Sequence, residues 1–289
     1  MSIIKYDDKY LTTHGLPNIQ NTCYLNSILQ CLFSCSSFVE KVNLICSGIK
    51  YLDKNDKCSY FAYLLKNIHD GVNSTSYIPD IYSELYTTLL NHSKITTNNV
   101  KLSLGQQDAH EGLLCILDIL NIPSVNELFE HRHISQILCH VCKYVSSKDE
   151  TNNIFEVQPE DFNSLYKYKT NLDDFICARC KDRKRKLKEV SLVMVPEILP
   201  ILIKKYNEKI LTSFPRILQF PSSNKNKIHY YKLVAQCEHL GTKNGGHYVA
   251  ICLRENNTWY MMDDLRFSRI EQSPTVNTYM CFYHYIDTK

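Results

Sequence analysis

The stretch of sequence that decides the fold is Asn18-Ile-Gln-Asn-Thr-Cys23, which leads directly into an apolar pattern typical of a helix. After Cys23, the apolar residues that fall on one stripe at helical spacing are Leu25, Ile28, Leu29 and Leu32. Cys23 is therefore predicted in the first turn of this helix, where free backbone N–H groups and the helix dipole favour an anion. Such a position lowers the pKa of a thiol and is typical of a cysteine nucleophile. The alternative interpretation is a small buried thiol that only packs.

A candidate base for this nucleophile is His247, which begins an apolar run that reaches Leu253. A polar turn follows at residues 255–257, and a second apolar run then ends in Asp263-Asp264. Both runs have the composition of strands, which predicts a hairpin. Residue 255 is the midpoint of 247 and 263, so His247 and Asp263 are expected opposite each other. Asp263 would then orient the imidazole, and the imidazole would accept the thiol proton. A hydrogen-bonded structural histidine is the alternative.

Composition limits the class of protein. The chain has 289 residues, of which 44% are hydrophobic and 22% are charged, so it can bury a full core. A net charge of +3 gives no reason to expect nucleic acid as a partner. Residues 1–10 do not resemble a signal peptide, and the longest apolar stretch, 192–203, is interrupted by Pro196, Glu197 and Pro200. We therefore expect no membrane partner, and we expect the thirteen cysteines to be intracellular thiols, metal ligands or a nucleophile.

The order of the elements predicts an α+β fold. Residues up to about 120 favour helices, for example at 61–65 and 109–120, whereas short alternating runs with clustered cysteines fill about 130–190. Strands are predicted from about 198 onward, at 198–203, 230–236, 247–253, 258–262 and 279–285. Helices first and strands later are typical of the α+β class.

Two C-x-x-C pairs predict a metal site. They are Cys139-His-Val-Cys142 and Cys177-Ala-Arg-Cys180, and together they offer four thiolates for a tetrahedral Zn²⁺ of structural type. The long interval between the pairs predicts a zinc ribbon extended by long strands. His140, His131 and His133 are weaker alternatives as ligands. The basic run 181–188 is interpreted as a solvated face rather than a localisation or nucleic-acid signal.

A third motif is Gln106-Gln-Asp-Ala-His-Glu111, which precedes a helical apolar pattern. Asp108 and Glu111 have the spacing of a capping box, which is a sufficient structural explanation for the motif alone.

Taken together and in this order, the motifs closely resemble the ubiquitin-specific protease family of cysteine deubiquitinases. The matching segments span nearly the whole chain, and they are 15–30, 106–111, the two C-x-x-C pairs, 198–206 and 245–264.

The resemblance implies a papain-like cysteine protease fold with a helical thumb, a β-rich palm and zinc-ribbon fingers. It implies a single catalytic domain over 1–289, which we divide into a thumb (1–125), mainly zinc-binding fingers (126–205) and a palm (206–289). The expected activity is thiol-dependent hydrolysis of isopeptide or peptide bonds after the C-terminal Gly-Gly of ubiquitin. The expected partners are ubiquitin and ubiquitinated proteins, and the expected location is intracellular, in the cytoplasm with the nucleus as the alternative.

By matching position, the resemblance makes Cys23 the nucleophile, His247 the general base and Asp263 its orienter, with Asp264 as the fallback acid. Asn18 matches the amide that stabilises the oxyanion. Further matching positions concern binding: Asp108 and Glu111 would contact the basic tail of ubiquitin, Gly245 and Gly246 belong to a loop (241–246) over the cleft, and Cys139, Cys142, Cys177 and Cys180 would hold Zn²⁺.

Three positions differ from the family pattern. Gln20 stands where a glycine is usual, and Gly112 and Met262 each replace a common phenylalanine. Gln20 is the main feature that favours an alternative function, a catalytically weak or inactive pseudo-enzyme that binds ubiquitin. A zinc-dependent nucleic-acid binder is a further alternative, which the near-neutral net charge disfavours.

Overall fold

The computed structural model describes ten segments of the chain, and everything below concerns these residues. They are 14–71, 78–95, 101–157, 167–184, 186–204, 214–221, 227–242, 245–254, 257–271 and 277–288.

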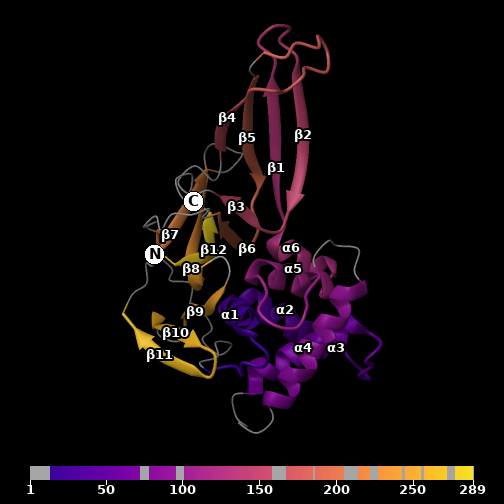
Figure 1. Cartoon of the computed structure of the whole chain (residues 1–289), viewed down its shortest axis with the longest axis vertical. Helices are drawn as coiled ribbons and strands as arrows, with labels where there is room; N and C mark the ends of the chain where they lie inside the picture. The colour runs from indigo at the N-terminus through magenta and orange to yellow at the C-terminus, as the bar shows by residue number, and fades with distance from the viewer. Residues whose placement is uncertain are drawn as a thin grey trace.

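Six helices form one lobe, which is the predicted thumb (Figure 1). They are α1 (Cys23–Leu32), α2 (Ser36–Ser47), α3 (Lys57–Asp70), α4 (Ile78–Ile95), α5 (Ala109–Ile119) and α6 (Pro123–Phe129). The local sequence determines where some of these helices begin. The Asp56 side chain accepts a hydrogen bond from Ser59 N–H at 3.2 Å and caps α3, and Pro123 is the first residue of α6. Every residue of α1 is buried, so the nucleophile helix is a core element rather than a surface helix.

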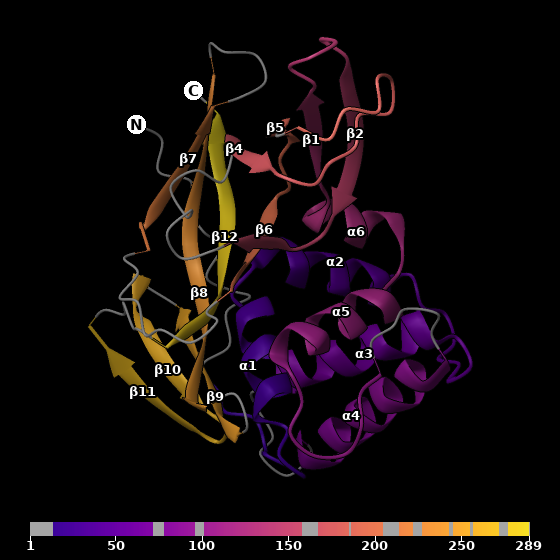
Figure 2. The same cartoon turned by 45° about the horizontal axis from the view of Figure 1, so that its top comes forward.

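The palm is an eight-stranded sheet that packs against this lobe. Its strand order is β11-β10-β9-β8-β12-β6-β3, and β7 also pairs with β8. The strands are β3 (Phe155–Val157), β6 (Ile198–Ile203), β7 (Ile217–Pro221), β8 (Ile228–Thr242), β9 (Gly245–Leu253), β10 (Trp259–Asp263), β11 (Arg266–Ile270) and β12 (Thr278–Thr288). Helix α1 contacts β8, β9 and β10, so it lies directly against the strands that carry the predicted catalytic residues (Figure 2).

Both faces of the palm sheet are buried. On β12, Met280 and Phe282 belong to the main core shared with the helices, whereas Cys281 and Tyr283 belong to a second core on the opposite face. This two-sided burial explains the continuous apolar run of β6, in which all six residues are buried.

The fingers are a second, antiparallel sheet with the order β2-β1-β5-β4. Its strands are β1 (His131–Leu138), β2 (Val145–Asn152), β4 (Lys167–Leu172) and β5 (Lys186–Met194). Figure 1 shows this sheet projecting from the body of the molecule as a long arm. The α+β class with a helical thumb, a β-rich palm and ribbon-like fingers is therefore confirmed.

No single helix in the described residues is long and apolar enough to cross a membrane. Only the pair α1 and α2, bent by 92°, meets the requirements of length and composition together.

Candidate functional site

Cys23 is the first residue of α1 and is buried, with 3% of its surface exposed. The backbone N–H of Tyr248 lies close enough to lower the pKa of its thiol, which places Sγ beside the residue that follows His247. The turn before it contains two non-glycine residues in the left-handed region, Gln20 with φ of 53° and Asn21 with φ of 65°. Gln20, which stands where the family has a glycine, thus has a backbone conformation that favours glycine, and so does Asn21, which the sequence analysis did not single out.

The electrostatic prediction for Cys23 is wrong in sign. Burial raises the pKa of the Cys23 thiol above its usual value, and the nearby Asp264 carboxylate raises it further, although N–H groups of Tyr248, Tyr24 and Cys23 act in the opposite direction. Desolvation therefore outweighs the helix terminus. The thiol depends on a base to lose its proton, and that base has to lie next to it.

His247 and Asp263 form the predicted pair. His247 Nε2 lies 2.6 Å from Asp263 Oδ1, and each side chain is about one-third exposed. With Nε2 engaged by the carboxylate, Nδ1 is the ring nitrogen that can accept a proton from Cys23.

The predicted register of this hairpin, however, is wrong by two residues. Met262 pairs with Ala250 and Trp259 with Leu253, so the pairing is centred on residue 256 rather than 255. Continuing this register places Val249 opposite Asp263, which makes His247 its diagonal neighbour on the same face. Diagonal neighbours remain within reach of long side chains.

Asp264 connects the histidine end of the site with the nucleophile loop. Its Oδ2 accepts from Asn18 Nδ2 at 2.7 Å and lies 4.0 Å from His247 Nε2, and its Oδ1 accepts from Asn26 Nδ2 at 2.7 Å. Asn18 is fixed at its other end as well, because its Oδ1 accepts from Thr22 N–H at 2.9 Å.

Asn26 is a site residue that the sequence analysis missed. Its buried amide also lies 3.2 Å from the carbonyl oxygen of Pro17 and 3.4 Å from that of Leu16, so it joins Asp264 to the segment before the nucleophile. The available signal was its position one helical turn after Cys23, which makes an asparagine in an otherwise apolar helix worth explaining.

A buried arginine fixes the nucleophile helix to the histidine strand. Arg254 follows β9 and is 1% exposed; its guanidinium donates to Gln30 Oε1 at 2.7 Å, to the Gln30 carbonyl at 3.1 Å and to Ser34 Oγ. This network holds the end of α1 against the end of β9, and so limits how far Cys23 and His247 can move apart.

The third motif lies beside the start of β9. Asp108 caps α5 by accepting from His110 N–H at 2.7 Å, and both of its carboxylate oxygens lie 2.7 Å from Tyr279 Oη. Gln106 Nε2 donates to the Gly246 carbonyl at 2.5 Å, which brings this motif to the start of the histidine strand. Glu111 is half-buried in the first turn of α5.

The space around the glycines of the site differs from one glycine to the next. A Cβ at Gly246 would lie 2.5 Å from His239 Nε2 and 2.7 Å from the Leu240 carbonyl, whereas a Cβ at Gly245 would meet nothing within 4 Å. Gly112 lies against Tyr24, whose ring would be 3.2 Å from an added Cβ, so Tyr24 occupies the space next to this departure from the family pattern. The loop predicted at 241–246 is described except for residues 243–244.

The four predicted metal ligands come together near the tip of the fingers. The Sγ atoms of Cys139 and Cys180 are 3.7 Å apart, as are those of Cys142 and Cys177, and all four lie within 4.8 Å of one another. Zn–S bonds of about 2.3 Å in a tetrahedron place sulfur atoms about 3.8 Å apart, so the geometry fits Zn²⁺.

The two C-x-x-C turns have the same local structure. Lys143 N–H donates to the Cys139 carbonyl and Lys181 N–H to the Cys177 carbonyl, each at 2.9 Å, and the two lysines have φ values of 60° and 59°.

One residue of the basic run 181–188 differs from the prediction of a solvated face. The side chain of Lys186 is buried and forms an ion pair with Asp182.

The histidines considered as alternative ligands lie elsewhere. His131 and His133 lie on β1 with ring centroids 5.0 Å apart, and both pack on Phe155. Neither belongs to the cysteine cluster, and burial lowers the pKa of His131 to about 4. His140 is exposed between two of the ligands.

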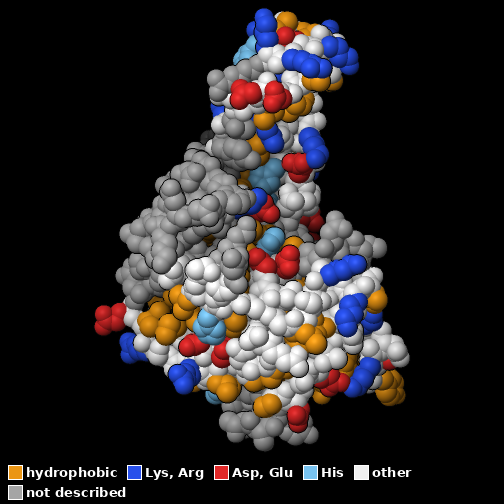
Figure 3. All heavy atoms as spheres, in the orientation of Figure 1, with side chains coloured by type: hydrophobic (Ala, Val, Ile, Leu, Met, Phe, Trp, Pro, Cys, Tyr) orange, Lys and Arg blue, Asp and Glu red, His pale blue; other side chains and the backbone are white. Residues whose placement is uncertain are grey.

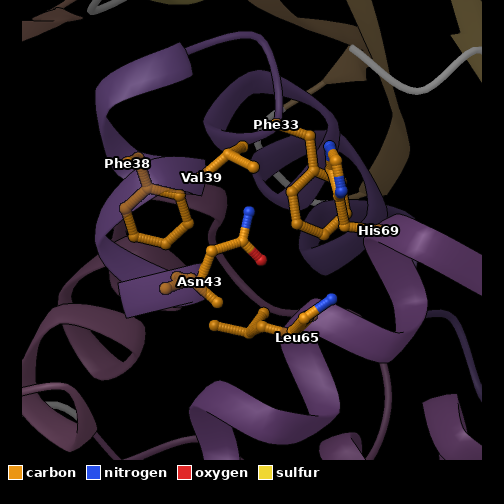
Figure 4. Close-up of a pocket in the computed structure, with 8 residues that line it drawn as sticks. Phe33, Phe38, Val39, Asn43, Leu65 and His69 are labelled. Carbon is orange, nitrogen blue, oxygen red and sulfur yellow. The ribbon is translucent and has the colours of Figure 1, made fainter. Parts of the chain in front are cut away.

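A shallow pocket in the thumb contains none of the predicted site residues. Figure 4 shows Phe38 and Val39 on one side and Phe33 beside His69 on the other, with Leu65 below them, and the pocket between them leaves no room for a water molecule. It is a packing feature of α2 and α3.

Comparison with known proteins agrees with these motifs. The family model for ubiquitin carboxyl-terminal hydrolase matches residues 14–283. Ubiquitin carboxyl-terminal hydrolase 8 of Saccharomyces cerevisiae is 25% identical over 340 residues, which cover 93% of this chain and 70% of the yeast protein. Human ubiquitin carboxyl-terminal hydrolase 2 is 26% identical over 348 residues, which cover 93% of this chain and 54% of the human protein.

Solved structures show the same fold. Ubp8 in a SAGA DUB module with Sgf11, Sus1 and Sgf73, bound to monoubiquitin, superimposes with a TM-score of 0.79 at 24% identity, covering all of this chain and 72% of that one. The same module bound to ubiquitin aldehyde gives a TM-score of 0.77 at 23% identity, with the same coverage.

Fold and site thus define a papain-like hydrolase built from thumb, palm and fingers. The chain belongs to the ubiquitin carboxyl-terminal hydrolase family, as its motifs predict, and family membership makes it a deubiquitinating hydrolase.

Proposed function

We propose that this chain is a cysteine-type deubiquitinase in which Cys23 is the nucleophile and His247 the general base. The observation that carries the proposal is the arrangement around the imidazole. Asp263 engages Nε2 at 2.6 Å, Nδ1 is left to accept a proton, and the Cys23 thiol lies beside the next residue of the same strand.

The first step follows from the raised pKa of Cys23. His247 Nδ1 takes the thiol proton as Sγ attacks the carbonyl carbon of the C-terminal glycine of ubiquitin. Asp263 stabilises the imidazolium that forms. Because the thiol is poorly ionised by its own environment, reactivity requires the imidazole and the carboxylate together.

Asn18 can donate a hydrogen bond to the oxyanion without losing its present contacts. An amide nitrogen carries two hydrogens, one of which Asn18 donates to Asp264, so the second N–H can donate to the developing oxyanion. The Cys23 backbone N–H is the second proposed donor. Asp264 is therefore a positioning residue for Asn18 and, at 4.0 Å, also a source of negative charge near His247.

Collapse of the tetrahedral intermediate breaks the bond to the leaving amine, which receives its proton from His247. A water molecule then attacks the thioester while His247 takes one of its protons. The products are ubiquitin with a free C-terminal carboxylate and regenerated Cys23 thiol.

For substrate binding, we infer that the tail of ubiquitin lies between the Asp108 region and Gly245–Gly246. The carboxylates of Asp108 and Glu111 suit the basic tail residues that the family resemblance implies. Gln106 hydrogen-bonds to the Gly246 carbonyl between these residues, so the tail would replace this contact when it binds.

We further propose that Cys139, Cys142, Cys177 and Cys180 hold a structural Zn²⁺. Four thiolates fill its coordination shell, so the ion would brace the finger sheet and supply no catalytic chemistry. None of the thirteen cysteines, all of which the structure describes, forms a disulfide, which supports a reducing intracellular compartment such as the cytoplasm or nucleus. Ubiquitin and ubiquitinated proteins are the proposed partners, with no nucleic acid.

The pseudo-enzyme alternative is not favoured. Gln20 adopts the left-handed conformation that a glycine would provide, and the His247–Asp263 pair remains intact beside Cys23.

The test uses ubiquitin that carries a thiol-reactive electrophile at its C-terminus, incubated with wild type and with Cys23→Ala. A covalent adduct that maps to Cys23, and that a ubiquitin-like modifier does not give, is the expected result. Adduct formation by Cys23→Ala, or none by the wild type, would contradict the proposal.

A further inference from the structure

An exposed apolar surface borders the catalytic groups at the edge of the palm. Leu265 is 67% exposed and Phe267 is 48% exposed, and they lie in the turn after Asp264 and on β11. Tyr260 of β10 supports the Phe267 ring at a centroid distance of 6.3 Å. Figure 3 shows hydrophobic side chains gathered over β10 and β11 beside a histidine and acidic side chains. We call Leu265 and Phe267 the exit patch.

The exit patch is continuous with the nucleophile loop. Leu16 N–H donates to the Asp264 carbonyl at 2.9 Å, and a Cβ on Gly15 would lie 2.4 Å from the Leu265 carbonyl oxygen. The turn is therefore held against the segment that leads to Asn18 and Cys23, and a molecule that contacts Leu265 also contacts the surroundings of the reacting bond.

The patch and the inferred tail site reach the catalytic residues through different segments. Gln106 contacts Gly246, which precedes His247, whereas Leu16 and Asn18 contact Asp264 and Gly15 packs against Leu265. If the glycine pair of ubiquitin enters between Gln106 and Gly246, its leaving group emerges over Leu265.

We propose that the exit patch binds the acceptor protein, the partner whose lysine carries ubiquitin. This inference rests on the proposed function. The acceptor chemistry that fits is an apolar surface next to the modified lysine with acidic side chains at its rim, because Arg266 and Arg269 are exposed on β11 beside the patch. β11 is the outermost strand of the sheet, so no neighbouring strand covers this edge in the described residues.

The experiment compares two leaving groups that share the same ubiquitin. One substrate is ubiquitin with a C-terminal aminomethylcoumarin amide, whose leaving group is too small to reach the patch. The other is the lysine-linked diubiquitin that the wild type cleaves fastest in a linkage panel. The variant is Leu265→Ser with Phe267→Thr, which changes no charge near His247, and the control is Leu44→Ser, which removes a 62% exposed leucine from α2.

We expect kcat/KM of the double variant to fall about tenfold or more on diubiquitin, which is the scale of two lost apolar interface contacts, and to stay within twofold on the coumarin substrate. The control should leave both values unchanged. Equal effects on both substrates, or no effect on either, would overturn the proposal. A self-association of the wild type that the double variant abolishes would overturn it too, since a second copy would then cover the patch. If the wild type cleaves neither substrate, the proposed function itself fails.

Discussion

Replacing Asn26 by alanine should lower both the stability of the protein and its kcat, whereas a control variant should lower stability alone. Asn26 donates to Asp264 Oδ1 at 2.7 Å and lies 3.2 Å from the Pro17 carbonyl, so the substitution removes one hydrogen bond to a carboxylate and one to the backbone. The first is worth about 1.5–3 kcal/mol and the second about 1 kcal/mol. The free energy of unfolding should therefore fall by about 3 kcal/mol, and Tm by about 6 °C or more.

The catalytic loss follows from the other oxygen of Asp264. Without Asn26, the Asp264 carboxylate is free to rotate away from Asn18, and the amide that we assign to the oxyanion loses its orientation. Loss of one such donor costs about 10²–10³ in kcat, so we expect a decrease of about 10² in kcat with little change in KM. Hydrolysis of the ubiquitin coumarin amide, measured well below the variant's Tm, gives both constants.

Ser34→Ala is the matched control, because it also removes a buried hydrogen bond to a charged group, Arg254, at the end of the same helix. The two hydrogen bonds from Arg254 to Gln30 remain in this variant and keep α1 against β9, so it should lower Tm by several degrees while leaving kcat within threefold. An Asn26→Ala enzyme whose kcat matches that of Ser34→Ala would refute the positioning role of Asn26.

Three further predictions concern other parts of the chain. Gln20→Gly should change kcat/KM less than about threefold, because φ at position 20 is already 53°, and a gain above tenfold would show that Gln20 impairs the enzyme. Cys142→Ser should reduce bound zinc, measured by plasma mass spectrometry, and should lower Tm; full zinc content would contradict the four-cysteine site. His131 should destabilise the protein in acid: its folded pKa of about 4 lies below the unfolded value near 6.5, so its contribution is complete above pH 6.5 and falls by about 3 kcal/mol as pH drops to 4. In urea unfolding at pH 7 and pH 4.5, His131→Leu should lose less stability between the two pH values than wild type, and an identical loss would count against this assignment.

Sequence alone predicted the parts of the fold that are fixed by local periodicity. Helix α1 begins at Cys23, and the apolar runs at 198–203 and 247–253 are the interior strands β6 and β9. Each C-x-x-C turn is a self-contained local structure, and the pairing of β1 with β5 brings the two turns together. The division of the chain at residues 125 and 205 remains a prediction.

The errors concern features that depend on the geometry of a turn or on contacts between residues far apart in the sequence. The hairpin is centred on residue 256 because Arg254 N–H donates to the Thr258 carbonyl at 2.8 Å and Asn257 has φ of 57°, details of turn chemistry that the spacing of His247 and Asp263 does not reveal. The prediction of a lowered pKa for the Cys23 thiol was wrong because the burial of Cys23 depends on the packing of α1 against β9. Asn26 was missed because its partner is 238 residues away along the chain.

The attachment of the fingers gives the molecule a mechanical property. Only Glu130 separates α6 from β1, and only residues 195–197 separate β5 from β6, so the arm is joined to thumb and palm by short tethers. Its eight-residue strand β1 spans about 27 Å, so the far end of the arm lies well away from the place where the arm joins the thumb and the palm. A protein that binds the far end of the arm therefore acts on the thumb through α6 and on the palm through β6, while the Arg254 network holds α1 against β9.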